Sequence, residues 1–358
     1  MRVKLKDITK FSKGTQINGK NLIDDGAYSY LNGGINPSGK WNGFNVAENT
    51  VTISEGGNSS GYVNYMNEAF WCGAHCYYLY DGPKNSKYLY YALKSQQERL
   101  FRIRSGACMP NIKKSDLGNF ILEYEQDEVR QKEVVKVLEK CELLIEDYKK
   151  ELELLDEAVR ARFVEMFGDE NNSKGWEIVN IEDVANVQVG VVIKPSQYYT
   201  DQNNGIKAFR SLNIGNGYIK DDDWVYFSEE GNKKNKKSIL STNDVLVVRS
   251  GAPGTACVVT SEYEGTNAID VIIAHPDFKK VDSYYLCTYT NMPHGKSQII
   301  EGTGGAAQQH FNVGKYNKLK LMLPPLEYQK QYVKFLEEID KSRLLSNHSL
   351  SLIKSINF

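Results

Sequence analysis

The feature that most limits how this chain can fold is an internal repeat. Residues 3–8 recur as residues 179–184, and Gly14 then falls opposite Gly190. Three further matches follow in the same order: residues 49–53 with 243–247, 88–91 with 284–287, and 131–139 with 329–337. The separation drifts slowly, from 176 residues between Val3 and Val179 to 198 between Gln131 and Gln329. Collinear matches of this kind predict a duplicated structural unit.

Each repeat begins with short strand-like segments and ends in a helical one. Residues 51–54 alternate in the manner of a strand, and turn-forming pairs such as Asn36-Pro37 and Gly82-Pro83 separate the segments. The first helix is predicted from about residue 126 to residue 167, with Gly168 as its C-terminal stop. Its length would be about 60 Å, more than a domain of this size needs for its own core.

Apolar residues in the predicted first helix recur in steps of three and four, which is the pattern of a coiled coil. They are Val134, Leu138, Cys141, Ile145, Tyr148, Leu152, Leu155 and Val159. A second helix is predicted after Pro324-Pro325, to the chain end, with Leu336, Ile339, Leu350 and Ile353 in the same register. Arg343 and Ser346 interrupt this register, so we expect looser packing there. The simplest partner for each helix is the other, although each could instead bind a different protein.

These patterns predict an α+β chain with two domains related by a pseudo-two-fold axis. Each domain would be β-rich with small helices, and two long antiparallel coiled-coil helices would join them. The predicted segments are residues 1–122, 123–170, 171–323 and 324–358, in the order domain, helix, domain, helix.

The net charge of −1 hides an uneven distribution. Residues 123–170 contain 16 acidic and 8 basic residues, so the rest of the chain carries a charge of +7. An acidic helix joining mildly basic domains suits a protein that binds DNA. The longest apolar runs, such as residues 245–248, are far shorter than the ~20 residues that span a bilayer. The start resembles no signal peptide, and we expect a cytoplasmic protein with reduced cysteines.

No catalytic constellation is evident. Residues 34–40 fit the start of a nucleotide-binding loop, but Trp41 stands where that motif needs Ser or Thr. An Asn/Asp-Pro-Pro-Tyr/Phe methyltransferase motif is missing, and none of the five histidines lies in a triad or zinc motif. Cys72 and Cys76 lack the second ligand pair of a structural zinc site. The sequence therefore favours a binding protein without its own metal or cofactor.

Sequence-specific DNA binding needs cations for phosphates and polar or aromatic groups for base edges. In the first repeat the candidates are Lys13, Lys40, Trp41, Asn58, Ser59, Ser60, Tyr62, Arg102 and Arg104. In the second repeat they are Arg210, Lys233, Lys234, Lys236, Arg249, Ser250, Gln308 and Gln309. Lysines on a loop can also be merely solvated, and Trp41 can belong to the core. Arg249 directly follows the apolar run of residues 245–248, which favours a specific role.

Several phrases resemble the DNA-specificity subunit of type I restriction-modification systems, over nearly the whole chain. Residues 161–169 (ARFVEMFGD) are similar to the end of that family's first conserved helix. Residues 176–184 (WEIVNIEDV) resemble the start of its second recognition domain, and residues 323–330 (LPPLEYQK) resemble its entry into a conserved helix. The resemblance implies that each recognition domain reads one half of a split DNA site, with the helices setting the spacing.

The resemblance also implies partners. Two copies of a modification subunit would dock on the helices and methylate adenine at N6, and a restriction subunit would translocate and cleave DNA. S-adenosylmethionine, ATP and magnesium are then expected on these partners, and none on this chain. A specificity chain of a type IIB-like system would share the architecture. A coiled-coil scaffold that binds only proteins is the alternative from another class.

The recognition segments of the two repeats differ: residues 55–60 (EGGNSS) stand opposite residues 249–254 (RSGAPG). Different loops imply two different half-sites, so we predict an asymmetric, interrupted DNA target. Methylome sequencing of cells that carry the system should show such a motif, and a continuous or palindromic motif would contradict the prediction.

Overall fold

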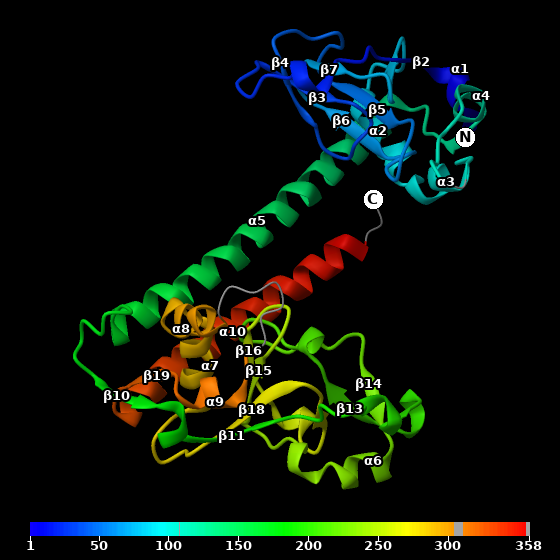
Figure 1. The fold of residues 1–358 in the computed structure, drawn as a ribbon. Coiled ribbons are helices and arrows are strands. Elements are labelled where there is room, and N and C mark those ends of the chain that lie inside the picture. Colours follow the sequence, from blue (N-terminus) through cyan, green and yellow to red (C-terminus); the bar gives the residue numbers. More distant parts are fainter. Residues whose placement is uncertain (107, 304–310, 356–358) are drawn as a thin grey trace. The chain divides into compact units, whose positions relative to one another are not determined.

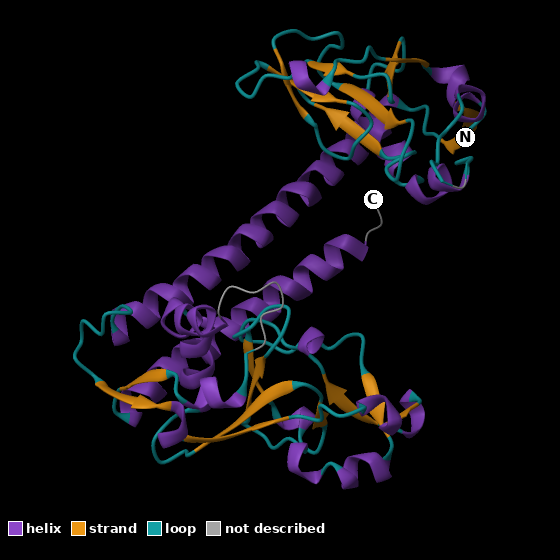
Figure 2. Cartoon of the chain, viewed as in Figure 1, coloured by secondary structure: helices purple, strands orange, loops and turns teal. Residues whose placement is uncertain are grey.

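The computed structural model describes residues 1–106, 108–303 and 311–355. By its internal contacts the chain divides into unit 1, residues 1–150 and 347–358, and unit 2, residues 151–346. Figure 1 traces both. The helices α5 (Glu128–Phe167) and α10 (Leu326–Ser355) each contribute to both units. The predicted α+β class is confirmed, because each unit combines mostly antiparallel sheets with separate helices (Figure 2).

Unit 1 is built on an antiparallel sheet in the order β2-β8-β5-β6. These strands are Lys10–Lys13, Cys76–Tyr80, Thr50–Ser54 and Val63–Met66. A smaller sheet follows the order β4-β3-β7, with strands Gly39–Trp41, Tyr28–Leu31 and Phe70–Cys72. The pair β1 (Arg2–Lys4) and β9 (Ile121–Glu123) closes the domain. Its helices are α1 (Leu5–Ile8), α2 (Ser86–Lys94), α3 (Gln97–Arg102) and α4 (Lys114–Gly118).

Unit 2 repeats this plan with a sheet in the order β11-β18-β15-β16. These strands are Ala185–Val189, Val271–Pro276, Val245–Val248 and Ala256–Val258. The smaller sheet, β12-β14-β13-β17, comprises Tyr199–Thr200, Val225–Phe227, Ile206–Phe209 and Asn267–Ala268. The closing pair is β10 (Glu177–Asn180) with β19 (Lys320–Leu323). Its helices are α6 (Glu229–Lys234), α7 (Ser283–Asn291), α8 (Pro293–Thr303) and α9 (Val313–Asn317).

The apolar run of β15 is explained by burial of the sheet on both faces. Val245 and Val247 join a core cluster with Tyr285 and Leu286 of α7. Leu246 and Val248 point the other way, into a cluster that contains Phe209 of the smaller sheet. A strand covered on both faces is apolar at every position instead of alternating.

The sequence repeat corresponds to a structural repeat. Asn49 and Asn243, matched in sequence, both adopt positive φ, at 57° and 72°. Gln131 and Gln329 are both buried at the entry to a long helix, where their Nε2 atoms donate to the carbonyl oxygens of Glu125 and Pro324, at 2.7 and 2.8 Å. Each glutamine therefore satisfies a buried carbonyl where the chain enters the helix.

Within unit 2, α5 and α10 run antiparallel. The Tyr332 hydroxyl donates to the carbonyl of Val159 at 3.2 Å, and Arg343 forms an ion pair with Asp156. Phe163 and Phe167 are fully buried and pack against Tyr332 and Tyr285. The predicted looseness near Arg343 and Ser346 is wrong, because Arg343 bridges the helices and Ser346 is only 3% exposed.

The burial of the α5 and α10 side chains identifies the seam of each helix. Leu336, Ile339 and Leu350 are buried, and Ile353 is half-buried. On α5, half-buried side chains recur at the predicted spacing: Leu138, Cys141, Ile145, Tyr148, Leu152, Leu155 and Val159. The prediction that Val134 lies in the seam is wrong, because its side chain is 41% exposed while that of its neighbour Val135 is half-buried. At the start of α5 the side chain that faces the seam is therefore Val135, one residue later than predicted. No helix in the described ranges is long and apolar enough to cross a membrane.

The matched glycines give a test of the repeat. A Cβ atom on Gly190 would lie 2.4 Å from the carbonyl oxygen of Ala268. The atoms that this Cβ would meet, in Ala268 and Ile269, belong to the backbone and cannot move aside. We therefore expect Gly190→Ala to lower the free energy of unfolding of unit 2 by ~1–3 kcal/mol, measured by urea unfolding. Gly19→Ala, where nothing lies within 4 Å of the added Cβ, is the control and should change stability little. Equal effects of the two substitutions would contradict the close approach.

Candidate nucleic-acid interface

In each unit the strand order brings four loops to one end of the domain. In unit 2, β13 and β17 are parallel, so the chain leaves both strands on the same side. The ends of β11 and β15 pair with the start of β18, at Val189–Ile272 and Val248–Val271. Residues 190–194, 210–215, 249–255 and 269–270 therefore emerge together. We call this set the loop edge of unit 2.

Unit 1 has the same arrangement. Its strands β3 and β7 are parallel, and β2 and β5 end beside the start of β8. Its loop edge comprises residues 14–18, 32–38, 55–62 and 73–75. Loops held by a rigid sheet at one end of a domain are a common location for binding residues.

The two loop edges share their backbone hydrogen bonds. The amides of Thr15 and Val191 donate to the carbonyl oxygens of Cys72 and Ala268, at 2.9 and 2.8 Å. In the same way, Ile112 N–H donates to Glu55 O at 2.9 Å, and Phe311 N–H donates to Arg249 O at 3.0 Å. Glu55 and Arg249 therefore occupy equivalent positions, each directly after the end of a strand.

At this equivalent position the charge is inverted. The Glu55 carboxylate lies 2.5 Å from Lys13 Nζ and 3.3 Å from Nδ1 of His75. Arg249 instead forms a 2.5 Å ion pair with Asp270, the residue that precedes β18 as His75 precedes β8. The side chains of Glu55 and Arg249 are similarly buried, at 16% and 15% exposure. One backbone framework thus carries two opposite charge arrangements.

The structure gives Arg249 partners within the protein. Its guanidinium is held by Asp270, and its Nε donates to the carbonyl of Phe311 at 3.2 Å. In this arrangement Arg249 holds the loop in place, and its contact with DNA stays a prediction. Ser250 follows it on the loop edge, half-buried. Gln308 and Gln309 lie outside the described residues.

Among the unit 1 candidates, Asn58 is exposed on the loop edge, while Ser59 and Ser60 shape it. The Ser59 hydroxyl donates to Gly33 O at 2.6 Å, and the Ser60 hydroxyl donates to Glu55 O at 2.8 Å. Ser60 is fully buried, so its assignment to DNA contact is wrong. Lys13 ends β2, directly before this edge, and pairs with Glu55. Tyr62 is half-buried, and Lys94 Nζ lies 3.7 Å from the centre of its ring.

Two other unit 1 candidate pairs lie beside the loop edge or away from it. Trp41 pairs with Tyr28 at the far end of the β3–β4 hairpin and packs edge-on against Trp71, whereas Lys40 is exposed on the same strand. Arg102 is exposed at the end of α3. Arg104 is half-buried over the ring of Phe101, at 3.9 Å.

The unit 2 lysines do not form the predicted loop. Lys233 and Lys234 end α6 and pair with Glu229 and Glu230, whereas Lys236 is exposed in a following 3-10 turn. The α6 segment is fixed to the start of β17 by a 2.6 Å hydrogen bond from Asn267 to Asn232, and the loop edge follows the end of that strand. Arg210 is on the loop edge but pairs with Asp223 at 3.1 Å.

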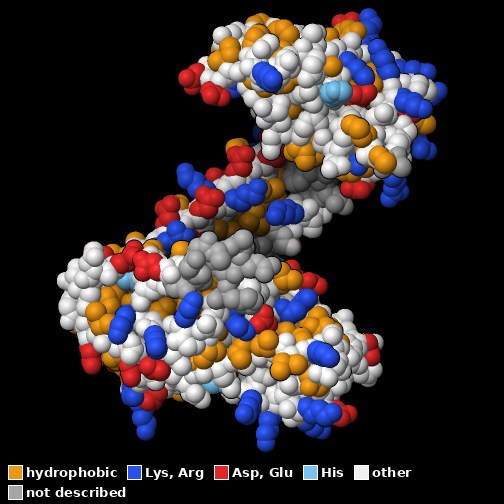
Figure 3. Space-filling model, viewed as in Figure 1, with side chains coloured by type: hydrophobic (Ala, Val, Ile, Leu, Met, Phe, Trp, Pro, Cys, Tyr) orange, Lys and Arg blue, Asp and Glu red, His pale blue; other side chains and the backbone are white. Residues whose placement is uncertain are grey.

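Unit 1 carries a basic patch that the sequence patterns did not predict. Arg2, Lys4, Lys6, Lys113 and Lys114 are all exposed, and none forms an ion pair within the described residues. Figure 3 shows Lys and Arg side chains gathered over the end of unit 1 that carries α1 and α4. The amide of Leu5 donates to Phe120 O at 2.9 Å, which brings these distant segments together. Unpaired surface cations of this kind suit phosphate contacts.

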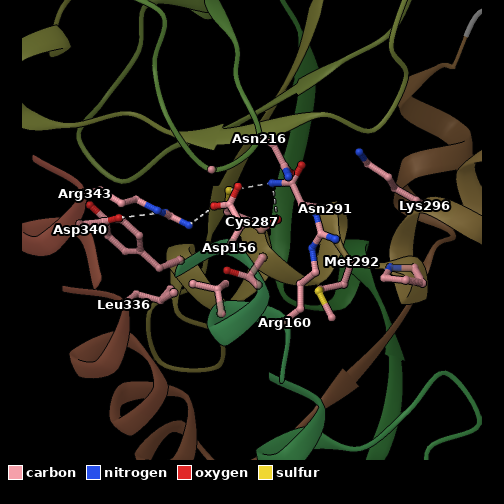
Figure 4. A pocket seen from close by; sticks show the side chains of 15 residues that line it. Asp156, Arg160, Asn216, Cys287, Asn291, Met292, Lys296, Leu336, Asp340 and Arg343 are labelled. Carbon is pink, nitrogen blue, oxygen red and sulfur yellow. Dashed lines mark hydrogen bonds and ion pairs between the residues drawn. The ribbon is translucent and has the colours of Figure 1, made fainter. Parts of the chain in front are cut away.

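Unit 2 also contains a cavity of about 330 Å³ where α5, α7 and α10 meet (Figure 4). Arg343 pairs there with both Asp156 and Asp340, and burial raises the pKa of Asp340. Asn216, Arg160 and Lys296 also line it. The opposed charges largely compensate one another, and the described residues that line the cavity include no triad or nucleophile–base pair. No group of three or more metal-binding side chains occurs among the described residues.

Comparison with known proteins identifies the family. The model of the type I restriction modification DNA specificity domain matches residues 1–155 and 173–355. The chain belongs to this family. A solved S subunit of the type I restriction-modification system from M. genitalium has the same fold, with a TM-score of 0.66. It is 19% identical, and the match covers 100% of this chain and 93% of the other.

Two relatives bear the same kind of description. A putative type I specificity subunit of Mycoplasma pneumoniae is 35% identical over 145 residues, 40% of this chain and 38% of the relative. The type I restriction enzyme MjaVIII specificity subunit of Methanocaldococcus jannaschii is 23% identical over 271 residues, 71% of this chain and 63% of the relative. Each match thus spans less than two thirds of the relative's length.

The Arg249–Asp270 pair can be tested by a double-mutant cycle on DNA affinity, measured by fluorescence anisotropy. If Arg249 only positions the loop through Asp270, the effects of Arg249→Ala and Asp270→Ala should not add, and each should weaken binding by ~1–3 kcal/mol. Additive effects would indicate that Arg249 contacts DNA independently. Thr242→Ala, a change outside this loop edge, is the control.

Proposed function

We propose that this chain is the non-catalytic specificity subunit of a type I restriction-modification complex. Each recognition domain contacts one half of an interrupted, asymmetric double-stranded DNA target through its loop edge. The observation that carries the proposal is the inverted charge at equivalent positions, Glu55 paired with Lys13 and Arg249 paired with Asp270, on a shared backbone framework. Two domains of one topology that differ at equivalent loop positions suit a target whose two halves differ.

The chemistry of the complex would belong to its partners. Two copies of a modification subunit would bind S-adenosylmethionine and methylate adenine at N6. A restriction subunit would use ATP and magnesium for translocation and cleavage. The antiparallel α5 and α10 would hold the recognition domains, and the acidic α5 would offer surface for docking the modification subunits. The family membership and the fold support this assignment.

The basic patch of unit 1 would hold DNA through its phosphates. Phosphate contacts give affinity and a salt dependence without reading sequence. Lys6 lies against α4, the helix that begins at Lys114, because a Cβ on Gly118 of α4 would lie 3.5 Å from the Cβ of Lys6. The loop edge would then supply selectivity, and the patch would supply part of the affinity.

The separate roles of the loop edge and the basic patch can be tested on the complex with its modification subunit. The triple substitution Lys6→Ala, Lys113→Ala and Lys114→Ala should weaken binding to target and non-target DNA alike. It should also reduce the slope of log affinity against log salt by about 0.9 for each phosphate that the protein no longer neutralises.

The matched control removes Lys233, Lys234 and Lys236, two of which pair with glutamates in unit 2. It should leave the slope nearly unchanged. If the unsubstituted complex bound DNA without salt dependence or target preference, the chain would instead be a protein scaffold and the proposed function would fail.

A further inference from the structure

Two adjacent apolar side chains project from the loop edge of unit 2. Val192 is 49% exposed and Ile193 is 79% exposed. Leu212, on the neighbouring loop of the same edge, is 60% exposed. Burying a Val, Leu or Ile side chain fully is worth roughly 1.5–3 kcal/mol. Single apolar side chains are commonly exposed on protein surfaces and need no explanation. A group of exposed apolar side chains at one place indicates a binding surface.

The backbone prevents this loop from folding back to bury them. Val191 N–H donates to Ala268 O at 2.8 Å, and Asp270 N–H donates to Val191 O at 3.2 Å. Gly190 is packed against the same carbonyl of Ala268. Directly after Ile193, Lys194 adopts a left-handed conformation with φ 44°, and Pro195 begins the next turn. The apolar pair is therefore held outward between two fixed points.

The equivalent loop of unit 1 is different in kind. After Gly14 and Thr15 it continues with Gln16, Ile17 and Asn18. Ile17 is only 8% exposed, and the exposed positions Gln16 and Asn18 are polar. The framework is shared, so the apolar tip distinguishes this loop of unit 2 from the equivalent loop of unit 1. A property found on one recognition loop and absent from its equivalent can distinguish one half-site from the other.

In the major groove the C5-methyl group of thymine is the apolar group that base edges present. We propose that Val192 and Ile193 contact thymine methyl groups and so select thymine in the half-site read by unit 2. Leu212 flanks this contact, and Lys194 lies next to it in the chain. The proposal rests on the proposed function and adds the base and the side chains that would read it.

The test replaces thymine by deoxyuridine, one position at a time, in the unit 2 half of the target found by methylome sequencing. This change removes one methyl group and leaves every hydrogen-bonding group in place. For the unsubstituted complex, at least one replacement should weaken binding about fourfold, the value of one buried methyl group. For Ile193→Ala that penalty should shrink to less than twofold.

The matched control is Ile178→Ala, which changes a 54% exposed isoleucine on β10 of the same unit. It should keep the full deoxyuridine penalty. A second variant, Ile193→Asn, replaces the apolar side chain of this exposed position by a polar one, and should lose thymine selectivity with an unchanged melting temperature.

The remaining outcomes are distinguishable. Specific binding with equal deoxyuridine penalties in Ile193→Ala and in the unsubstituted complex would overturn this inference alone. A unit 2 half-site without thymine on either strand would do the same. Loss of assembly with the modification subunit in Ile193→Ala would identify the pair as a protein contact. Absence of any target preference in the unsubstituted complex would overturn the proposed function itself.

Discussion

The recognition loops of both units depend on a backbone contact that has no room for a side chain. Where the first strand of each large sheet ends, a Cβ on Gly14 or Gly190 would lie 1.9 or 2.4 Å from the carbonyl oxygen of Cys72 or Ala268. That carbonyl belongs to the strand that runs parallel to its neighbour. The contact therefore fixes the exit direction of several segments together, and the four loops of each edge leave the domain on one side.

On this framework the polar partners can change while the backbone stays the same. The large sheet of unit 2 is buried on both faces, so substitutions within it would create cavities or overpacking. The side chains just after the strands are under no such constraint. Glu55 and Arg249 satisfy their charges with different partners yet accept equivalent backbone hydrogen bonds. Different surfaces can thus be built on one fold at little cost in stability.

The architecture could be predicted from the sequence because its signals are local and repeated. The matched Gly14 and Gly190, the glutamines at the helix entries and the heptad pattern each carry their own physical reason. The site could not be predicted in the same way. Whether Arg249 reads a base depends on Asp270, 21 residues away, which only the fold brings beside it. The basic patch likewise needs α4 to lie against α1, although Lys6 and Lys113 are far apart in sequence.

In the seam between α5 and α10, too, the sequence could not show which partner a polar side chain has. Arg343 breaks the apolar register of α10, and by sequence alone such a break predicts weak packing. In the structure its guanidinium reaches Asp156 on α5 while Ile339 remains buried on the same seam. A polar residue in a seam costs stability, but it is satisfied in only one alignment of the helices. Together with the Tyr332–Val159 hydrogen bond, it fixes the register of α10 against α5 within unit 2. An apolar residue would leave that register to packing alone.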